Sequence, residues 1–233
     1  MADTLTLVQA SPLFRDLPEP ERQQLARRTV RRRLERREIL FHQGDDANAA
    51  YLLASGQLRL SKLNPDGEQV IVSFIVPGQV FAVVAGMQTT RYPVTAEAVE
   101  QSDVLVWSRE VLREVMQRYP AVAFEAMRTV SARMQDLQER YRELASLPVP
   151  QRLARALLRL TRQAGRESDE GLVLEMRLGR QDLAELTGTT LYTASRTLAG
   201  WEKQGILASS RERVVIRDRG ALEALASEEL PAR

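Results

Sequence analysis

Cysteine is absent from the sequence, and histidine occurs once, as His42. The absence of cysteine excludes disulfides, thiolate metal sites, Cys-ligated iron–sulfur clusters and cysteine nucleophiles. A single histidine also leaves almost nothing for a multi-histidine metal site or a histidine-dependent catalytic triad. We therefore expect no metal centre. An enzyme would have to rely on carboxylate or Ser/Lys chemistry, for which the sequence shows no motif.

Long apolar runs are missing as well. No stretch approaches the roughly 18 apolar residues of a membrane-spanning helix. The N-terminal MADTLTLVQASPLF lacks the basic segment followed by an apolar segment that marks a secretion signal. We therefore expect a cytoplasmic protein that makes no membrane contact. With 33 Lys and Arg against 31 Asp and Glu, the net charge is only +2. Any binding of nucleic acid must then come from locally placed basic residues.

The N-terminal half combines a helical start with a run of short strands. Residues 1–23 have helical character. The arginine-dense segment 26–40 is interpreted as a solvated helix end and an edge strand, in preference to a nucleic-acid patch. From 39 to 107, short apolar segments alternate with turn signals such as NPDG at 64–67. Residues 98–108 are expected to form the last strand pair, and the spacing predicts a small β-barrel or roll.

A heptad pattern runs through residues 120–146. Apolar residues recur there at alternating spacings of four and three, and the flanking positions are polar or charged. The apolar positions are Ala123, Met127, Val130, Met134, Leu137, Tyr141 and Leu144. A helix packed on its own domain could use such a face, but a strict period of 3.5 residues favours a partner helix running alongside. We therefore expect a symmetric dimer along this seam.

The segment LPVPQ at 147–151 marks a hinge, because its two prolines cannot continue a helix. A smaller domain is expected to follow it. Its first elements are a helix at 151–164, a loop at 165–171 and a strand at 172–176. The remaining elements are two short helices and a hairpin, and the residues in them give the main indication of function.

The two short helices meet at Gly188. Glycine at this place ends the first helix, GRQDLAELT, and Thr189 or Thr190 can cap the second. Two short helices joined by a tight glycine-containing turn have the layout of a helix-turn-helix. The following ILASSRERVVIRDRGAL predicts a β-hairpin, which makes the domain a winged helix. The hairpin arginines that could lie beside a phosphate backbone are Arg211, Arg213 and Arg217.

The second helix has one apolar and one polar face. The residues expected to be buried are Leu191, Ala194, Leu198 and Trp201. The opposite face carries Thr189, Tyr192, Thr193, Ser195, Arg196 and Ala199. Short hydroxyl side chains let a helix approach the major groove, and arginine presents a fork of donors to guanine or phosphate. No residue from Thr187 to Gly200 is acidic, so this face predicts a recognition helix that contacts DNA.

These motifs resemble the Crp/Fnr family of bacterial transcription regulators over nearly the whole chain. GRQDLAELTGTTLYTASRTLAGWEKQGIL is similar to the family's DNA-binding signature. The segments that resemble its sensor domain are QGD at 43–45, SGQLRL at 55–60, DGEQVIVSFIVPGQVF at 66–81 and TAEAVEQSDVLVWS at 95–108. The resemblance implies an α+β fold with a cyclic-nucleotide-binding-like β-roll at 1–109, a dimerisation helix at 110–146 and a winged helix-turn-helix at 147–233. It also implies a homodimer on palindromic double-stranded DNA that recruits or blocks RNA polymerase.

The resemblance assigns DNA contacts residue by residue. Arg180 and Gln181 stand where the family contacts phosphates. The positions on the recognition helix are Thr190, Tyr192, Ser195 and Arg196. Ser195 and Arg196 match the SR pair of the Fnr-like branch, whose arginine reads a guanine. Tyr192 departs from the glutamate that many members carry. A phenol cannot accept a hydrogen bond from a cytosine amino group as a carboxylate does, so the base preference there is expected to differ.

The sensor region departs from the members that bind cyclic AMP. Those members carry a GE pair and a later R-S or R-T pair, which hold the ribose and the phosphate. Here Ala82 and Val83 stand where the GE pair falls, and Arg91 is followed by Tyr-Pro. We therefore expect no cyclic AMP. We expect no haem either, because His42 is interpreted as a surface residue. The candidate pocket residues are Phe74, Phe81, Met87, Arg91, Tyr92 and Thr95, with the alternative that they simply fill the barrel.

Two other functions stay open at this point. One is a cyclic-nucleotide-binding module whose C-terminal domain docks a protein, which the missing ribose-binding carboxylate and the acid-free helix face oppose. The other is an enzyme, which the lack of any catalytic motif opposes. A DNA-binding regulator accounts for more of the sequence than either of them.

Overall fold

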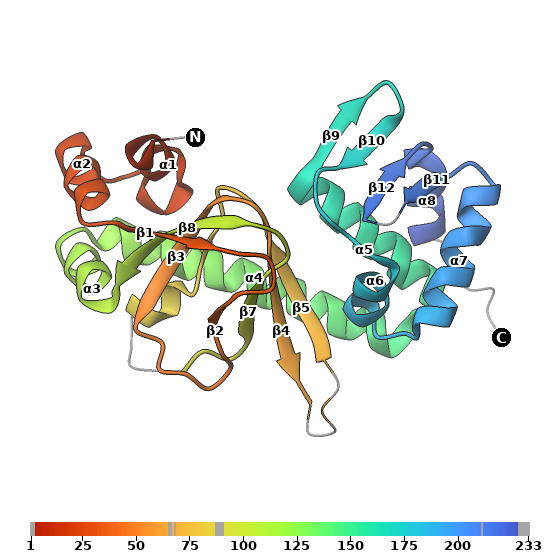
Figure 1. Cartoon of the computed structure of the whole chain (residues 1–233), viewed down its shortest axis with the longest axis horizontal. Coiled ribbons are helices and arrows are strands. Elements are labelled where there is room, and N and C mark those ends of the chain that lie inside the picture. The colour runs from red at the N-terminus through yellow and green to blue at the C-terminus, as the bar shows by residue number, and fades with distance from the viewer. Residues whose placement is uncertain (1–2, 65–66, 68, 87–90, 211, 228–233) are drawn as a thin grey trace. The chain divides into compact units, whose positions relative to one another are not determined.

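The computed structural model describes residues 3–64, 67, 69–86, 91–210 and 212–227 (Figure 1). They form two compact units, one drawn from residues 1–62 and 72–136 and the other from residues 63–71 and 137–233. Helix α4 (Pro120–Ser146) contributes residues to both. Its bounds confirm the helix that the heptad pattern predicts. The predicted recognition helix, which includes Thr190 to Trp201, lies wholly in the second unit.

The chain begins with short helices, continues as strands and returns to helices. The elements up to the end of α4 are α1 (Thr4–Ala10), η1 (Pro12–Phe14), α2 (Glu19–Arg27), β1 (Val30–Leu34), β2 (Ile39–Phe41), β3 (Ala49–Ser55), β4 (Leu58–Leu63), β5 (Gln69–Ile75), β6 (Val80–Phe81), η2 (Val83–Gly86), β7 (Thr95–Ala98), β8 (Ser102–Ser108), α3 (Arg109–Arg118) and α4. The switch from strand to helix occurs at Ser108, whose hydroxyl accepts a hydrogen bond from the Val111 N–H and caps α3.

The strands form two four-stranded sheets, with the orders β1-β8-β3-β6 and β2-β7-β4-β5. Side chains from both sheets share one buried cluster, which confirms the predicted β-roll. The expected strand pair within residues 98–108 is wrong. Strand β7 ends at Ala98 and pairs with β2 and β4, whereas β8 pairs with β1 and β3. In the NPDG turn, Gly67 has a φ of 82° and donates its N–H to the Asn64 carbonyl; Pro65 and Asp66 lie outside the described residues.

The arginine-dense segment is a helix end followed by an edge strand, as expected. Helix α2 ends at Arg27, and β1 is the first strand of its sheet. Neighbouring acids pair with its arginines: Arg28 with Glu114 at 2.7 Å and Arg32 with Glu38 at 3.0 Å. Charged side chains on an edge strand also oppose pairing with other chains. The segment is therefore explained by the fold.

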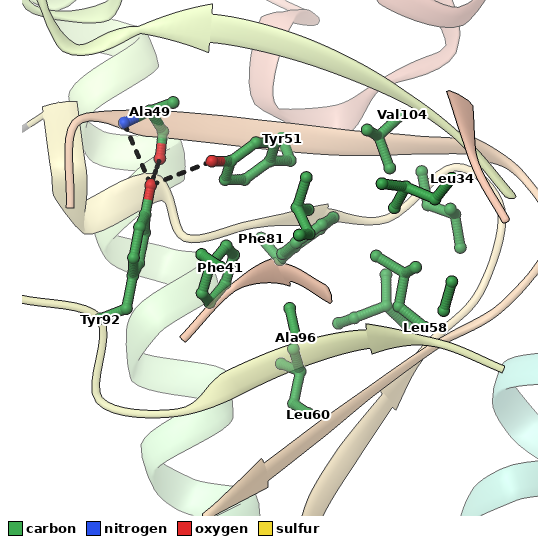
Figure 2. Packing of buried hydrophobic residues seen from close by; sticks show 14 of the residues in the cluster. Leu34, Phe41, Ala49, Tyr51, Leu58, Leu60, Phe81, Tyr92, Ala96 and Val104 are labelled. Atoms are coloured by element: carbon green, nitrogen blue, oxygen red, sulfur yellow. Dashed lines mark hydrogen bonds between the residues drawn. The ribbon is translucent and has the colours of Figure 1, made fainter. Parts of the chain in front are cut away.

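Aromatic rings stack through the middle of the barrel (Figure 2). The Tyr92 ring lies 3.8 Å from the Phe41 ring, centroid to centroid, and Tyr51 stacks between Phe41 and Phe81 at 5.5 and 5.2 Å. The Tyr92 hydroxyl donates to the Ala49 carbonyl at 2.9 Å and accepts from the Ala49 N–H at 3.2 Å. It also lies 3.2 Å from the Tyr51 hydroxyl. Burial, and next to it the hydrogen bond with Tyr92, raise the pKa of the Tyr51 phenol above its usual range.

Removing the Tyr92 hydroxyl is expected to destabilise the barrel. In Tyr92→Phe, the Ala49 backbone groups and the Tyr51 hydroxyl lose a buried partner. The loss should lower the free energy of unfolding by about 1–3 kcal/mol. Tyr192→Phe is the matched control, because Tyr192 is 74% exposed. Urea unfolding followed by circular dichroism measures both, and equal stability of the two variants would contradict the role given to the Tyr92 hydroxyl.

A second core lies between the first sheet and the helices. It brings together side chains of α1, α2, α3, β3, β8 and the first turns of α4. At its centre Phe14 meets Trp107 edge-on at 5.1 Å, and the Trp107 indole N–H donates to the Thr29 hydroxyl at 2.8 Å. An aromatic pair with its polar atom satisfied is a stable core element. Val122 and Ala126 join this core, so the start of α4 packs within the first unit.

The second unit contains the helices and hairpins of the C-terminal part. After α4 its elements are α5 (Val149–Ala164), β9 (Gly165–Ser168), β10 (Gly171–Leu174), α6 (Arg180–Thr187), α7 (Leu191–Lys203), β11 (Leu207–Ser210), β12 (Arg213–Ile216) and α8 (Arg219–Ser227). The strands form one sheet in the order β11-β12-β10-β9. The expected loop at 165–171 is therefore wrong in part, because residues 165–168 form an exposed strand that pairs with β10.

Candidate DNA-binding site

Helices α6 and α7 are bounded by local caps. The Gly179 N–H donates to the Asp182 carboxylate at 2.8 Å at the start of α6. Gly188 ends α6 in the left-handed region, with a φ of 61°, which glycine adopts without the penalty of a Cβ. The Thr190 hydroxyl then accepts from the Thr193 N–H at 3.2 Å and caps α7. These are the features of the helix-turn-helix that the sequence predicts, and Thr190 is the capping residue.

One face of α7 is buried, with one correction. Ala194, Leu198 and Trp201 are 0, 1 and 4% exposed, as predicted. Leu191 is 47% exposed, so its assignment to the buried face is wrong. Leu191 is the first residue of the helix, and no preceding turn of α7 lies beside it. The exposed face of α7 therefore begins with an apolar residue.

The polar face of α7 points away from the buried core. Tyr192 is 74% exposed, Arg196 is exposed, and Ser195 and Thr193 are half-buried. The Thr193 hydroxyl lies 2.9 Å from that of Thr190. Among the described residues, none forms a hydrogen bond or an ion pair with the Arg196 guanidinium. The guanidinium can thus present its donors to a base edge or a phosphate.

Arg180, Gln181 and Thr189 are held by contacts within the unit. The Arg180 guanidinium lies 3.0 Å from the Glu202 carboxylate and 3.4 Å from the Ser209 hydroxyl. The Gln181 amide donates to the Glu185 carboxylate at 2.8 Å. The Thr189 N–H donates to the Ala184 carbonyl at 2.9 Å. To contact a phosphate, Arg180 would have to share its guanidinium with Glu202. Phosphate contact by Arg180 and Gln181 stays a prediction.

The wing hairpin is formed by β11 and β12. Arg213 pairs with Glu170 at 3.2 Å, and Arg177 pairs with Glu212. Arg217 is exposed, whereas Arg211 lies outside the described residues. The wing therefore carries basic side chains, but acids accompany some of them. Contact of the wing arginines with DNA stays a prediction.

Sequence reasoning missed two arginines that hold the turn between α6 and α7. Arg152, in the first turn of α5, donates to the carbonyls of Thr187 at 3.0 Å and Gly188 at 3.2 Å. Arg140, in α4, donates to the Leu186 carbonyl at 3.1 Å. Burial lowers the pKa of Arg152, although an arginine stays charged at neutral pH. Nothing in the local pattern marks these residues, because their acceptors are backbone atoms about 35 to 46 residues away.

The predicted seam of α4 is exposed over most of its length. The exposed fractions are 53% for Met127, 36% for Val130, 55% for Met134, 52% for Leu137, 75% for Tyr141 and 49% for Leu144. Ala123 differs, because it is half-buried against the second core. Phe124, the next residue, is 67% exposed. The heptad pattern did not identify it, because it does not occupy one of the seam positions. The apolar row is continuous along the helix.

The described candidate pocket residues occupy different surroundings. Phe81 and Tyr92 lie in the aromatic stack. Phe74 is buried outside that cluster. The Thr95 hydroxyl accepts from the Gln43 N–H at 3.0 Å. Arg91 is exposed and forms a strand bridge with Asp46, and Met87 lies outside the described residues. Within the barrel the aromatic side chains therefore occupy the interior themselves.

Two further properties bear on the alternatives. Within the described ranges, no group of three or more His, Asp or Glu side chains is arranged to hold a metal ion. His42 is exposed. No helix in the described part of the chain combines the length and the apolar character needed to span a bilayer.

Known proteins match both units. Residues 31–119 match the family model of the cyclic nucleotide-binding domain, and residues 151–225 match that of the Crp-like helix-turn-helix domain. The chain is 30% identical over 220 residues to the cyclic AMP receptor protein of Thermus thermophilus, with 94% of this chain and 98% of the relative covered. It is 34% identical over 188 residues to the nitrogen fixation regulation protein FixK of Azorhizobium caulinodans, with 79% and 75% covered. The solved structure of FixK2 from Bradyrhizobium japonicum has a TM-score of 0.77 at 24% identity and covers 87% of this chain and 99% of that one, which supports the fold.

Proposed function

The chain belongs to the Crp/Fnr family of DNA-binding transcription regulators, and from that premise we propose that it acts as a homodimer on a two-fold symmetric DNA site with no nucleotide in its barrel. The observation that carries the proposal is the exposed face of α7. It presents Tyr192 and Arg196 outward with no acid from Thr187 to Gly200. Such a face can enter a major groove without repelling the phosphates.

The homodimer accounts for the exposed seam. Exposed apolar side chains in a continuous row favour association, because burying them removes apolar surface from water. A second α4 would supply matching knobs and holes at a 3.5-residue period. Two-fold symmetry places two copies of α7 on half-sites about one helical turn apart, roughly 10 base pairs. The family further suggests that the bound dimer acts on RNA polymerase, in the cytoplasm.

The proposal that the barrel binds no nucleotide rests on how its side chains pack. The relative from Thermus thermophilus is named a cyclic AMP receptor protein, so a nucleotide is the first candidate effector. Val83, where the ribose-binding carboxylate falls in cyclic-AMP-binding members, is apolar and buried. Arg91 is exposed, and the following Tyr92 puts its ring into the aromatic stack. These residues do not fit a nucleotide, and we propose that DNA binding needs none.

Selection from a random DNA pool tests the proposal. Purified protein, without added nucleotide, is expected to enrich one palindromic motif. Affinity for that motif should fall steeply with salt, by roughly 10³–10⁵ between 50 and 200 mM if 6–10 phosphates are contacted. Parallel selections with cyclic AMP and cyclic GMP are the controls. Failure to enrich any sequence would refute the DNA-binding proposal. Enrichment only with a nucleotide would refute the proposal for the barrel alone.

A further inference from the structure

The guanidinium of Arg152 joins three parts of the second unit. It projects from the first turn of α5, and Nη1 donates to the Leu147 carbonyl just after α4 at 3.0 Å. Its other nitrogens donate to Thr187 and Gly188, the last residue of α6 and the residue that ends it. The carbonyls at a helix C-terminus lack intrahelical partners and carry partial negative charge. One cation therefore ties the end of α4 to the turn of the helix-turn-helix.

Arg140 and Leu144 make a second attachment at the same turn. Arg140, on α4, donates to the Leu186 carbonyl at 3.1 Å and to the Ile71 carbonyl at 3.3 Å. A Cβ added to Gly188 would come within 2.7 Å of the Leu144 side chain, so Leu144 packs closely on the turn. The two arginines and Leu144 line one small cavity together with Leu186 and Thr187. The turn is thus held by hydrogen bonds to the carbonyls of three consecutive residues, 186 to 188, and by the apolar contact with Leu144.

Ion pairs also join the last turns of α4 to helix α5, which carries Arg152. Glu143, on α4, is 3% exposed and lies 2.6 Å from the Arg159 guanidinium of α5. Arg155 reaches the Glu139 carboxylate at 3.2 Å. Charge-assisted hydrogen bonds between two helices are geometrically demanding, above all when one partner is buried. The last turns of α4 and helix α5 therefore form one support for the turn.

We propose that Arg140 and Arg152 are positioning residues that fix α7 relative to the end of α4 and thereby set the half-site spacing that the dimer accepts. The inference rests on the proposed homodimer and goes beyond it. Only Leu147 and Pro148 lie between α4 and α5, and the contacts of Arg140 and Arg152 add a direct link from this junction to the turn of the helix pair. With the turn held, each α7 stands at one distance and angle from the seam. With the turn released, each α7 can reach several positions, so the dimer tolerates several spacings.

Probes with altered half-site spacing test the inference. The selected palindrome is rebuilt with its half-sites one and two base pairs closer or farther apart. Wild-type protein is expected to prefer the selected spacing by about tenfold or more, as two fixed recognition helices require. In Arg152→Met and Arg140→Met that preference should fall to about threefold or less, whereas the half-site sequence preference stays unchanged. Arg162→Met is the control, because Arg162 lies exposed at the other end of α5.

Each outcome of this experiment has a distinct meaning. Affinity that falls equally at all spacings, or a spacing preference equal to that of Arg162→Met, would overturn the positioning role. Arg152→Lys keeps the charge but loses the fork of donors, so it should retain an intermediate preference. If circular dichroism shows that Arg152→Met is unfolded, Arg152→Lys and Arg140→Met decide the question. A wild-type protein that enriches no sequence would instead refute the proposed function.

Discussion

Replacing Arg196 with alanine is expected to weaken binding to the selected DNA site by about 1–3 kcal/mol. The affinity would fall roughly 5- to 150-fold. Arg196 lies on the exposed face of α7, and none of the described residues forms a hydrogen bond or an ion pair with its guanidinium. The variant therefore removes DNA contacts without breaking a contact in the protein. Competition binding against probes altered at each half-site position measures the effect.

The pattern across probes separates base reading from phosphate contact. If Arg196 reads a guanine, the alanine variant loses its preference at one position and keeps it elsewhere. If it contacts a phosphate, affinity falls evenly over all probes and the salt slope decreases by about one. Arg196→Lys retains the charge without the planar fork and should resemble alanine only in the first case. Unchanged preference at every position would remove Arg196 from base reading.

Replacing Met134 with lysine is expected to break the proposed dimer. Met134 lies in the middle of the seam and is 55% exposed in the single chain. Next to a two-fold axis, the substitution would bury two ammonium groups against each other, which costs several kcal/mol when neither is paired. Dimerisation should weaken by about 100-fold or more, and DNA affinity should fall with it because a monomer holds one half-site. Sedimentation over a concentration series measures the first effect.

A matched charge away from the seam serves as the control. Gln135 is the next residue along α4 and is exposed. One helical step turns it about 100° away from Met134. Gln135→Lys adds the same charge and should leave the dimer intact. If Met134→Lys sediments as a dimer at the same concentrations as Gln135→Lys, the seam is misplaced on α4.

Local signals account for the parts of the fold that sequence reasoning found. The left-handed Gly188, the Thr190 cap and the buried Ala194, Leu198 and Trp201 each depend on residues within one or two helical turns. The helix from Pro120 to Ser146 follows from its repeat in the same way. Leu191 has the same spacing as the buried residues but is exposed. At the first residue of a helix, burial depends on which other segments pack against that end of the helix, and the spacing of apolar residues does not show this.

Contacts between distant segments escaped the same reasoning. Strands β7 and β8 follow each other closely in the chain but belong to different sheets. The sequence did not predict this, because the alternation of apolar residues shows which face of a strand is buried but not which strand pairs with it. Strand β9 has the polar composition of a loop and is ordered by pairing with β10. The Arg180–Glu202 ion pair joins residues 22 positions apart, in a place where the resemblance implies a phosphate contact.

The sequence by itself determined the family, the helix-turn-helix and the polar face of α7, because each follows from residue types and spacings within a short segment. Tertiary structure alone decided that Tyr92 stacks on Phe41 inside the barrel and that Arg140 and Arg152 hold the turn before α7. The reason is physical. A cap or a heptad is satisfied by neighbours along the chain, whereas a ring filling a core or a guanidinium on a carbonyl needs a partner that only folding brings near.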